Sequence, residues 1–163
     1  MSRDRLLYAL PALACVALLG FGYYLQYFEE QDPCPLCLVQ RGFYYAVLGT
    51  FALAALHGPK KLGNKIYCIA ALIWALSGAA VAARQAWLQH LPADKVPDCG
   101  PDLNFMLKNL PLGRALEKLF MGSGQCAEVN WKFHGLSIAE WSLAWFAALA
   151  LYALWLACRK RAA

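Results

Sequence analysis

Two cysteines separated by two residues, Cys34 and Cys37, stand in the segment DPCPLC between two long apolar runs. A c-type haem attachment would need histidine after the second cysteine, where Leu38 stands. A closed zinc site needs four ligands, and Cys99 and Cys126 complete such a set, but their loop lacks the second Cys-x-x-Cys that usually anchors one. A structural disulfide across so short a loop gains little chain entropy. The pair therefore favours thiol–disulfide exchange.

Local helix chemistry supports a reactive pair. Pro35 suits the first position of a helix, which makes Cys34 the cap and places Cys37 in the first turn. Unpaired N–H groups and the positive end of the helix favour a thiolate there. Gln40 and Arg41 follow Cys37 by three and four residues, so both share its helical face. An arginine one turn into a membrane is a functional candidate, with snorkelling to the headgroups as the alternative.

The elements that must position these residues are membrane spans. Hydrophobic residues make up 61% of the 163 residues and charged residues 15%, against about 25% charged in soluble domains. Four stretches reach the roughly 20 residues that a spanning helix needs: residues 6–27, 38–56, 66–88 and 138–157. Their length and lack of alternation argue against a soluble bundle and against barrel strands. We expect an all-α membrane protein, a bundle of four transmembrane helices in one domain over residues 1–163.

Charge sets the expected orientation. Three basic clusters flank the spans: Arg3 and Arg5; Lys60, Lys61 and Lys65; and Arg159, Lys160 and Arg161. The positive-inside rule places all three, and both termini, in the cytoplasm. All ten acidic residues except Asp4 then fall on the other side. The net charge of +5 is thus an orientation signal, and no basic patch interleaved with aromatic residues indicates nucleic acid.

Two segments, residues 28–36 and 89–137, remain outside the cytoplasm. The second is rich in proline and glycine, so most of it should be irregular. Residues 112–120 are the exception, since their leucines fall on one helical face. This short amphipathic helix either lies on the bilayer surface or packs on the rest of the loop.

The seven cysteines sort by location. Four lie on the non-cytoplasmic side, where disulfides persist: Cys34, Cys37, Cys99 and Cys126. Cys15, Cys68 and Cys158 lie in apolar spans, and we assign them to packing alone, because buried cysteine behaves as a small hydrophobic residue.

Three features together carry a resemblance: the segment PCPLCLVQR, the loop cysteines, and the stretch GSGQCAEVNWKFHGLSIAEW. In this order they resemble the disulfide bond formation protein B (DsbB) family, the bacterial inner-membrane thiol oxidases, over the whole chain. The resemblance implies that a Cys99–Cys126 disulfide accepts electrons from a reduced, periplasmic DsbA-like thioredoxin-fold oxidase and that Cys34–Cys37 reoxidises it. Membrane quinone, ubiquinone or menaquinone, takes the electrons last. The redox loops would then lie in the periplasm.

The same resemblance implies a quinone site. Cys37 would react with the quinone as a thiolate, with Arg41 stabilising negative charge. The third span ends in ARQAWLQHLP, whose four-residue spacings pair Arg84 with Leu88 and Gln85 with Gln89. The family pattern often has histidine where this chain has Gln85, and an acid where it has Gln40. The predicted quinone contacts are Arg41, Gln40, Arg84, Gln85, Leu88, Gln89 and His90.

Two other functions share some of these features. A related membrane thiol–disulfide exchanger, acting between proteins or on a quinone such as vitamin K epoxide, would share the Cys-x-x-Cys but should differ in helix number and loop pairing. A non-catalytic tetraspan adaptor would carry structural disulfides. An adaptor would not convert quinone to quinol, which separates it from the oxidase.

Overall fold

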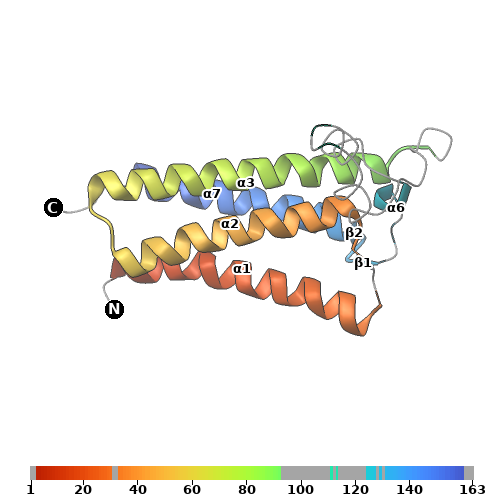
Figure 1. The fold of residues 1–163 in the computed structure, drawn as a ribbon, viewed down its shortest axis with the longest axis horizontal. Helices are drawn as coiled ribbons and strands as arrows, with labels where there is room; N and C mark the ends of the chain where they lie inside the picture. The colour runs from red at the N-terminus through yellow and green to blue at the C-terminus, as the bar shows by residue number, and fades with distance from the viewer. Residues whose placement is uncertain are drawn as a thin grey trace.

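The structure, a computed structural model, describes residues 3–30, 33–92, 111, 113, 124–127, 129 and 131–159. Within these residues, four helices are long and apolar enough to cross a membrane: α1 (Arg3–Phe28), α2 (Pro35–His57), α3 (Lys61–Gln89) and α7 (Ile138–Cys158). They contain the four predicted stretches, and the predicted four-helix membrane bundle is confirmed. The ends of the described chain lie at one end of the bundle, and the short elements lie at the other (Figure 1).

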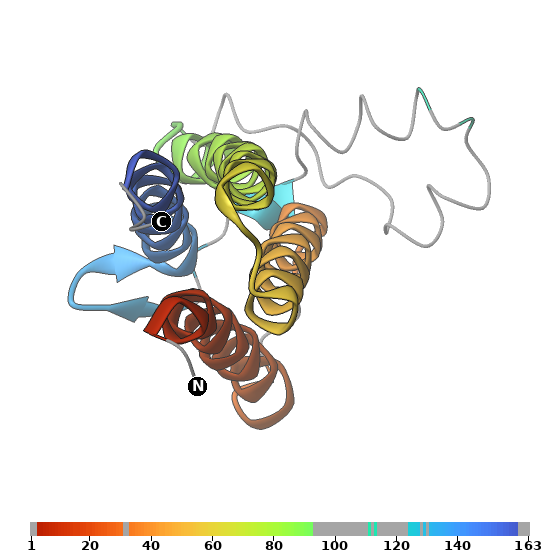
Figure 2. The ribbon, with the colours of Figure 1, turned by 90° about the vertical axis from the view of Figure 1, so that its left-hand side faces the viewer.

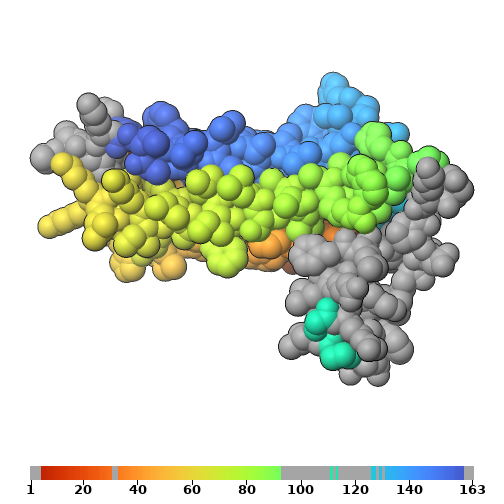
Figure 3. Space-filling model, turned by 90° about the horizontal axis from the view of Figure 1, so that it is seen from above, coloured from red at the N-terminus to blue at the C-terminus, as the bar shows by residue number. Residues whose placement is uncertain are grey.

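Packing follows the order α1–α2–α3–α7 (Figures 1 and 2). The most extensive interface joins α3 to α7, which lie side by side along their length (Figure 3). Gly78 permits this approach, since a Cβ at that position would clash with the ring of Phe146. Phe146 is itself fully buried and stacks on Tyr44 with ring centroids 4.0 Å apart. Glycine at this position thus leaves room for the Phe146 ring of α7 against α3.

The bundle core is mainly apolar, although Asn64 is buried in it and donates to the Leu156 carbonyl at 3.1 Å. Its largest fully buried side chains include Tyr8, Phe51 and Phe146. Cys15 and Cys68 are buried in this core, as predicted for packing residues, whereas Cys158 ends α7 and is exposed. Its expected burial is wrong because in the last turn of α7 it is Leu156, 3% exposed, that faces the core, and Cys158 lies on another face of the helix.

Two helix starts are fixed by their caps. Cys34 caps α2 with Pro35 directly behind it, and the Cys37 N–H donates to the Cys34 Sγ at 3.4 Å, as the sequence predicts. At α7 a reciprocal capping box joins Ser137 and Glu140. Both caps lie at the end of the bundle that carries the short elements (Figure 1).

A β-hairpin leads into α7, in a loop for which the sequence predicted no strand. Its strands, β1 (Lys132–Phe133) and β2 (Leu136–Ser137), pair antiparallel. His134 and Gly135 join them with positive φ values of 51° and 81°, the backbone that a two-residue hairpin turn of this kind requires. The Trp141 Nε1–H donates to the Phe133 carbonyl at 3.0 Å, which ties the hairpin to α7.

The remaining short element is α6 (Gly124–Ala127), which packs on α3 and α2. Cys99 lies outside the described residues, as does the predicted helix over residues 112–120 apart from Gly113.

Candidate redox site

Three sulfurs lie in contact where α2, α3 and α6 meet. The Cys34 S–H donates to the Cys37 Sγ over 2.9 Å, and the side chain of Cys126 is hydrogen-bonded to Cys34. Cys34 is therefore the middle sulfur of a row of three. Cys126 and Cys34 are buried, while Cys37 is half-buried. Cys126 is therefore close to Cys34 and Cys37 in space, although a long loop separates them in sequence.

Apolar packing holds this row together. Leu36, Val81 and Leu88 form one buried cluster with Cys34 and Cys126. These side chains come from α2 and α3, so the cluster presses α6 against both helices. Burial of this kind keeps water from the sulfurs on the side that these residues cover.

The environment of Cys34 favours its thiol form. Its pKa lies far above the ordinary value because the thiol is hydrogen-bonded to Cys126 and Cys37, and because burial disfavours the anion. In the reduced state Cys34 is therefore a donor, and negative charge falls on a neighbouring sulfur. This suits a sulfur that is attacked rather than one that attacks.

A pair of buried amides adjoins the sulfurs, and Gln85 is the one that contacts them. The Gln85 Nε2 donates to the Cys37 Sγ at 3.1 Å and to the Cys34 Sγ at 3.4 Å. The Gln40 Nε2 donates to the Gln85 Oε1 at 2.6 Å. Gln40 and Gln85 are 5% and 4% exposed, so this polar contact lies wholly inside the protein.

A cavity of about 490 Å³ opens beside Cys34 and Cys37. Its walls come from α1, α2, α7, the end of α3 and the hairpin. Most lining side chains are apolar or aromatic, among them Leu18, Phe21, Leu25, Tyr44, Trp131, Phe133, Trp141 and Trp145. The polar lining residues include Gln40, Arg41, Gln85, Gln89, Ser137 and Ser142. Such a site suits a flat, largely apolar ligand with a few polar atoms.

Arg41 lines this cavity, but its guanidinium turns toward α1. It donates to the Gln26 Oε1 at 2.5 Å and to the Gly22 carbonyl at 2.9 Å, and lies 4.8 Å from the ring centroid of Tyr23. Arg41 is half-buried. These contacts hold a cation at the cavity wall, in place of the snorkelling to headgroups considered from the sequence.

The residues predicted at the end of the third span divide by helical face. Gln85 and Gln89 line the cavity. Arg84 does not and stacks over Trp87 at 4.4 Å, and Leu88 is fully buried in the sulfur-side cluster. Spacing alone made the two pairs equivalent, whereas the packing of α3 turns one pair toward the cavity and the other away.

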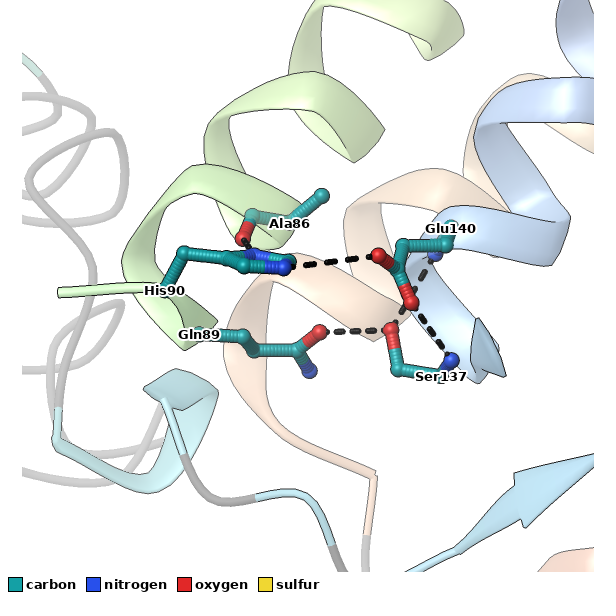
Figure 4. Close-up of polar contacts among 5 residues, drawn as sticks. All are labelled: Ala86, Gln89, His90, Ser137 and Glu140. Carbon is teal, nitrogen blue, oxygen red and sulfur yellow. Dashed lines mark hydrogen bonds and ion pairs between the residues drawn. The ribbon is translucent and has the colours of Figure 1, made fainter. Parts of the chain in front are cut away.

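His90 also lies outside the cavity lining, with a side chain that is 69% exposed. Its Nδ1–H donates to the Ala86 carbonyl at 2.8 Å, and its Nε2 lies 3.6 Å from the Glu140 Oε1 (Figure 4). Beside it the Ser137 hydroxyl donates to the Gln89 Oε1 at 2.6 Å (Figure 4). These contacts join the end of α3 to the start of α7, which gives His90 a structural role at the rim.

Sequence reasoning missed the aromatic wall and the partner of Arg41. Gln26 lies near the end of the first span, and the signal that could have identified it is that an arginine placed within a membrane needs a polar partner. Trp131 reaches α1 through an edge contact with Phe21, at a centroid distance of 5.7 Å. The aromatic residues of the segment 131–145 were a signal, because tryptophan and tyrosine gather at membrane interfaces.

This chain is similar to known proteins over most of its length. The family model described as "Disulfide bond formation protein DsbB" matches residues 4–156. A disulfide bond formation protein B of Nitrosococcus oceani is 46% identical over 151 residues, which cover 93% of this chain and 89% of that protein. The corresponding protein of Azoarcus sp. is 48% identical over 148 residues, or 90% and 88% of the two chains. That of Marinobacter nauticus is 43% identical over 158 residues, or 96% and 94%.

Proposed function

The chain belongs to the disulfide bond formation protein B family, and from this premise we propose that it is a quinone-dependent thiol oxidase that reoxidises a DsbA-like partner. Membership makes it a multi-pass membrane protein of disulfide formation. The partner, the quinone and the orientation in the inner membrane, with both termini cytoplasmic and the redox loops periplasmic, are our inferences.

One observation carries the proposal. The row Cys126, Cys34, Cys37 starts in α6, at the end of the long loop, and ends at the wall of the 490 Å³ cavity. A thiol oxidase needs such a route, because its protein partner arrives from water and its electron acceptor from lipid. An adaptor with structural disulfides has no need of sulfurs beside an apolar cavity.

The sulfur chemistry follows from this order. A partner thiolate attacks Cys99 of the Cys99–Cys126 disulfide and releases Cys126 as a thiolate. Cys126 then attacks the Cys34 sulfur of the Cys34–Cys37 disulfide, so a Cys34–Cys126 bond forms and Cys37 leaves as a thiolate. The partner's second thiolate resolves its bond to Cys99. The two electrons now rest on Cys37 and Cys99, and Cys37 holds its charge at the cavity wall.

The residues around the cavity fit a quinone. Its volume falls within the usual 300 to 1,000 Å³ or so of ligand sites, and Tyr44, Trp141 and Trp145 offer apolar surface to a flat ring. Arg41 supplies a cation for an electron-rich oxygen. When bound, the quinone supplies an acceptor for two electrons and two protons, and so permits the Cys34–Cys37 and Cys99–Cys126 disulfides to re-form.

Turnover in lipid vesicles tests this function. The purified chain is mixed anaerobically with a reduced thioredoxin-fold dithiol protein and a soluble short-chain quinone, and both oxidised dithiol and quinol are measured. We expect equal amounts of the two products. Cys37→Ser should abolish turnover, while Cys158→Ser, at the far end of α7, should leave it unchanged. A chain that binds the dithiol protein but forms no quinol would establish the adaptor instead.

A further inference from the structure

The amide of Gln85 occupies an unusual place. It lies inside a membrane-spanning helix, is 4% exposed, and directs its polar atoms at two redox sulfurs rather than at solvent. A buried amide group is costly unless its hydrogen bonds are made. Its hydrogen bonds with Cys34, Cys37 and Gln40 therefore offset the cost of burying this amide.

Gln40 determines which end of the amide meets the sulfurs. Its Nε2 donates to the Gln85 Oε1 at 2.6 Å, so the Gln85 oxygen is already an acceptor for α2. The Gln85 Nε2 is then left to point at the Cys37 Sγ, 3.1 Å away, nearer than the Oε1, which accepts from the Cys37 thiol at 3.5 Å. A reversed amide would offer oxygen to the sulfurs and would favour thiols, which is the opposite chemical effect.

We propose that Gln85 is a catalytic residue that donates a hydrogen bond to the Cys37 thiolate, and that Gln40 is the positioning residue that orients it. The inference rests on the proposed function and assigns to Gln85 a role toward sulfur in place of the expected contact with quinone. When Cys126 displaces Cys37 from its bond with Cys34, the electron pair of the broken bond stays on the Cys37 sulfur. The N–H of Gln85 faces that charge as it forms.

The oxidation state of Cys34 decides which donors reach Cys37. In the fully reduced chain the Cys34 S–H also donates to the Cys37 Sγ at 2.9 Å, whereas in the Cys34–Cys126 disulfide that S–H is gone and the Gln85 N–H is the donor that stays. Neither amide gains or loses a proton in the working range of pH, so their support for the thiolate is independent of pH. A residue that titrates, such as histidine or glutamate, would make that support rise or fall with pH.

Alkylation of Cys37 tests the proposal without quinone or partner. The full chain is reduced anaerobically in lipid nanodiscs and treated with iodoacetamide across a pH series, and modified Cys37 is quantified by mass spectrometry. Cys37 is half-buried and lines the cavity, so the reagent has a route to it. Gln85→Met, which keeps length and suits an apolar helix, should raise the pH midpoint by about one unit and slow alkylation at neutral pH about tenfold.

Gln40→Met should shift the midpoint in the same direction by a smaller amount, because Gln85 remains but loses its orienting donor. Ala83→Leu, on an exposed part of the same turn of α3, should cause no shift. An unchanged or lowered pH midpoint in Gln85→Met would overturn the proposal. A lowered midpoint would show that the amide accepts a hydrogen bond from the Cys37 thiol. Quinol formation by the unaltered chain is scored separately, so failure of the proposed function is recognised independently of this result.

Discussion

Replacing Arg41 with methionine removes the cation from the cavity wall while keeping a long side chain. The structure holds this guanidinium with Gln26 and the Gly22 carbonyl, and over the ring of Tyr23. All three contacts lie on α1, so the substitution should leave the sulfur row on α2 and α6 in place. We therefore expect a defect in the use of quinone and a normal reaction of the loop cysteines with the partner.

The expected loss of rate depends on how many N–H groups of the guanidinium remain available to a ligand. Loss of one well-placed donor to a developing oxyanion costs about 10² to 10³ in kcat. Arg41 is half-buried, and two of its N–H groups are already donated to α1. Water and existing partners thus weaken its pull on a ligand, and we expect a loss of about tenfold to a hundredfold, corresponding to about 1.4 to 2.7 kcal/mol.

The assay is the steady-state rate of quinol formation in vesicles, with kcat/KM for a short-chain quinone as the readout. Arg41→Lys should recover part of the rate, because its ammonium is a point charge without the planar fork. Arg84→Met makes the same change of charge on the neighbouring helix, where the side chain stacks on Trp87 outside the cavity lining, and should change the rate less than Arg41→Met. Equal losses in Arg41→Met and Arg84→Met, or none in Arg41→Met, would refute this reasoning.

Three other predictions follow from the same structure. Thiol labelling of single cysteines should place Lys60 in the cytoplasm and Asp94 in the periplasm, and periplasmic labelling at Lys60 would reverse the orientation. Gly78→Ala should lower the unfolding temperature in detergent, because its methyl group meets the buried ring of Phe146 and overpacking costs about 1–3 kcal/mol; an unchanged temperature would show that the ring moves aside. A partner variant without its resolving cysteine should be trapped on Cys99, as seen by non-reducing gels and peptide mapping, and a bond mapped to Cys126 would reverse the order of transfer.

Local sequence was sufficient for the helices and for the start of α2. Long apolar stretches can satisfy their backbone groups in lipid only as helices, and the order Cys34, Pro35, Cys37 fixes a cap within one turn. These features depend on neighbours in the chain. The fold class and the placing of Cys34 and Cys37 at a helix start were therefore predictable.

Contacts between helices were harder to predict from the sequence. The four-residue spacing on the third span predicted two pairs of residues as quinone contacts without distinguishing between them. The rotation of α3 against α2 and α7 turns Gln85 and Gln89 toward the cavity, and Arg84 and Leu88 away from it. The Arg41 side chain turns toward Gln26, a residue 15 positions earlier in sequence, and this contact depends on how α1 packs against α2. Helical periodicity identifies faces, but it does not say which helix each face meets.

The proximity of Cys126 to Cys34 shows the same limit. A long loop separates the two residues, and no local pattern sets where its end returns to the bundle. The structure brings α6 back through apolar contacts with Leu36, Val81 and Leu88, which are unremarkable members of their spans in sequence. The four cysteines were identifiable as redox candidates, and the resemblance indicated that Cys126 engages Cys34, but the apolar contacts that bring α6 to that place required the fold.

The most direct test of the central claim, that electrons leave the protein from Cys37, is a single-turnover reaction of the fully reduced chain with a soluble quinone under anaerobic conditions. Quinol is measured by absorbance, and new disulfides are mapped by mass spectrometry. We predict that the first quinol appears together with a Cys34–Cys37 disulfide and that Cys126→Ser retains this step. Cys37→Ser should form no quinol. Quinol formation by Cys37→Ser at the rate of the unaltered chain would contradict the account.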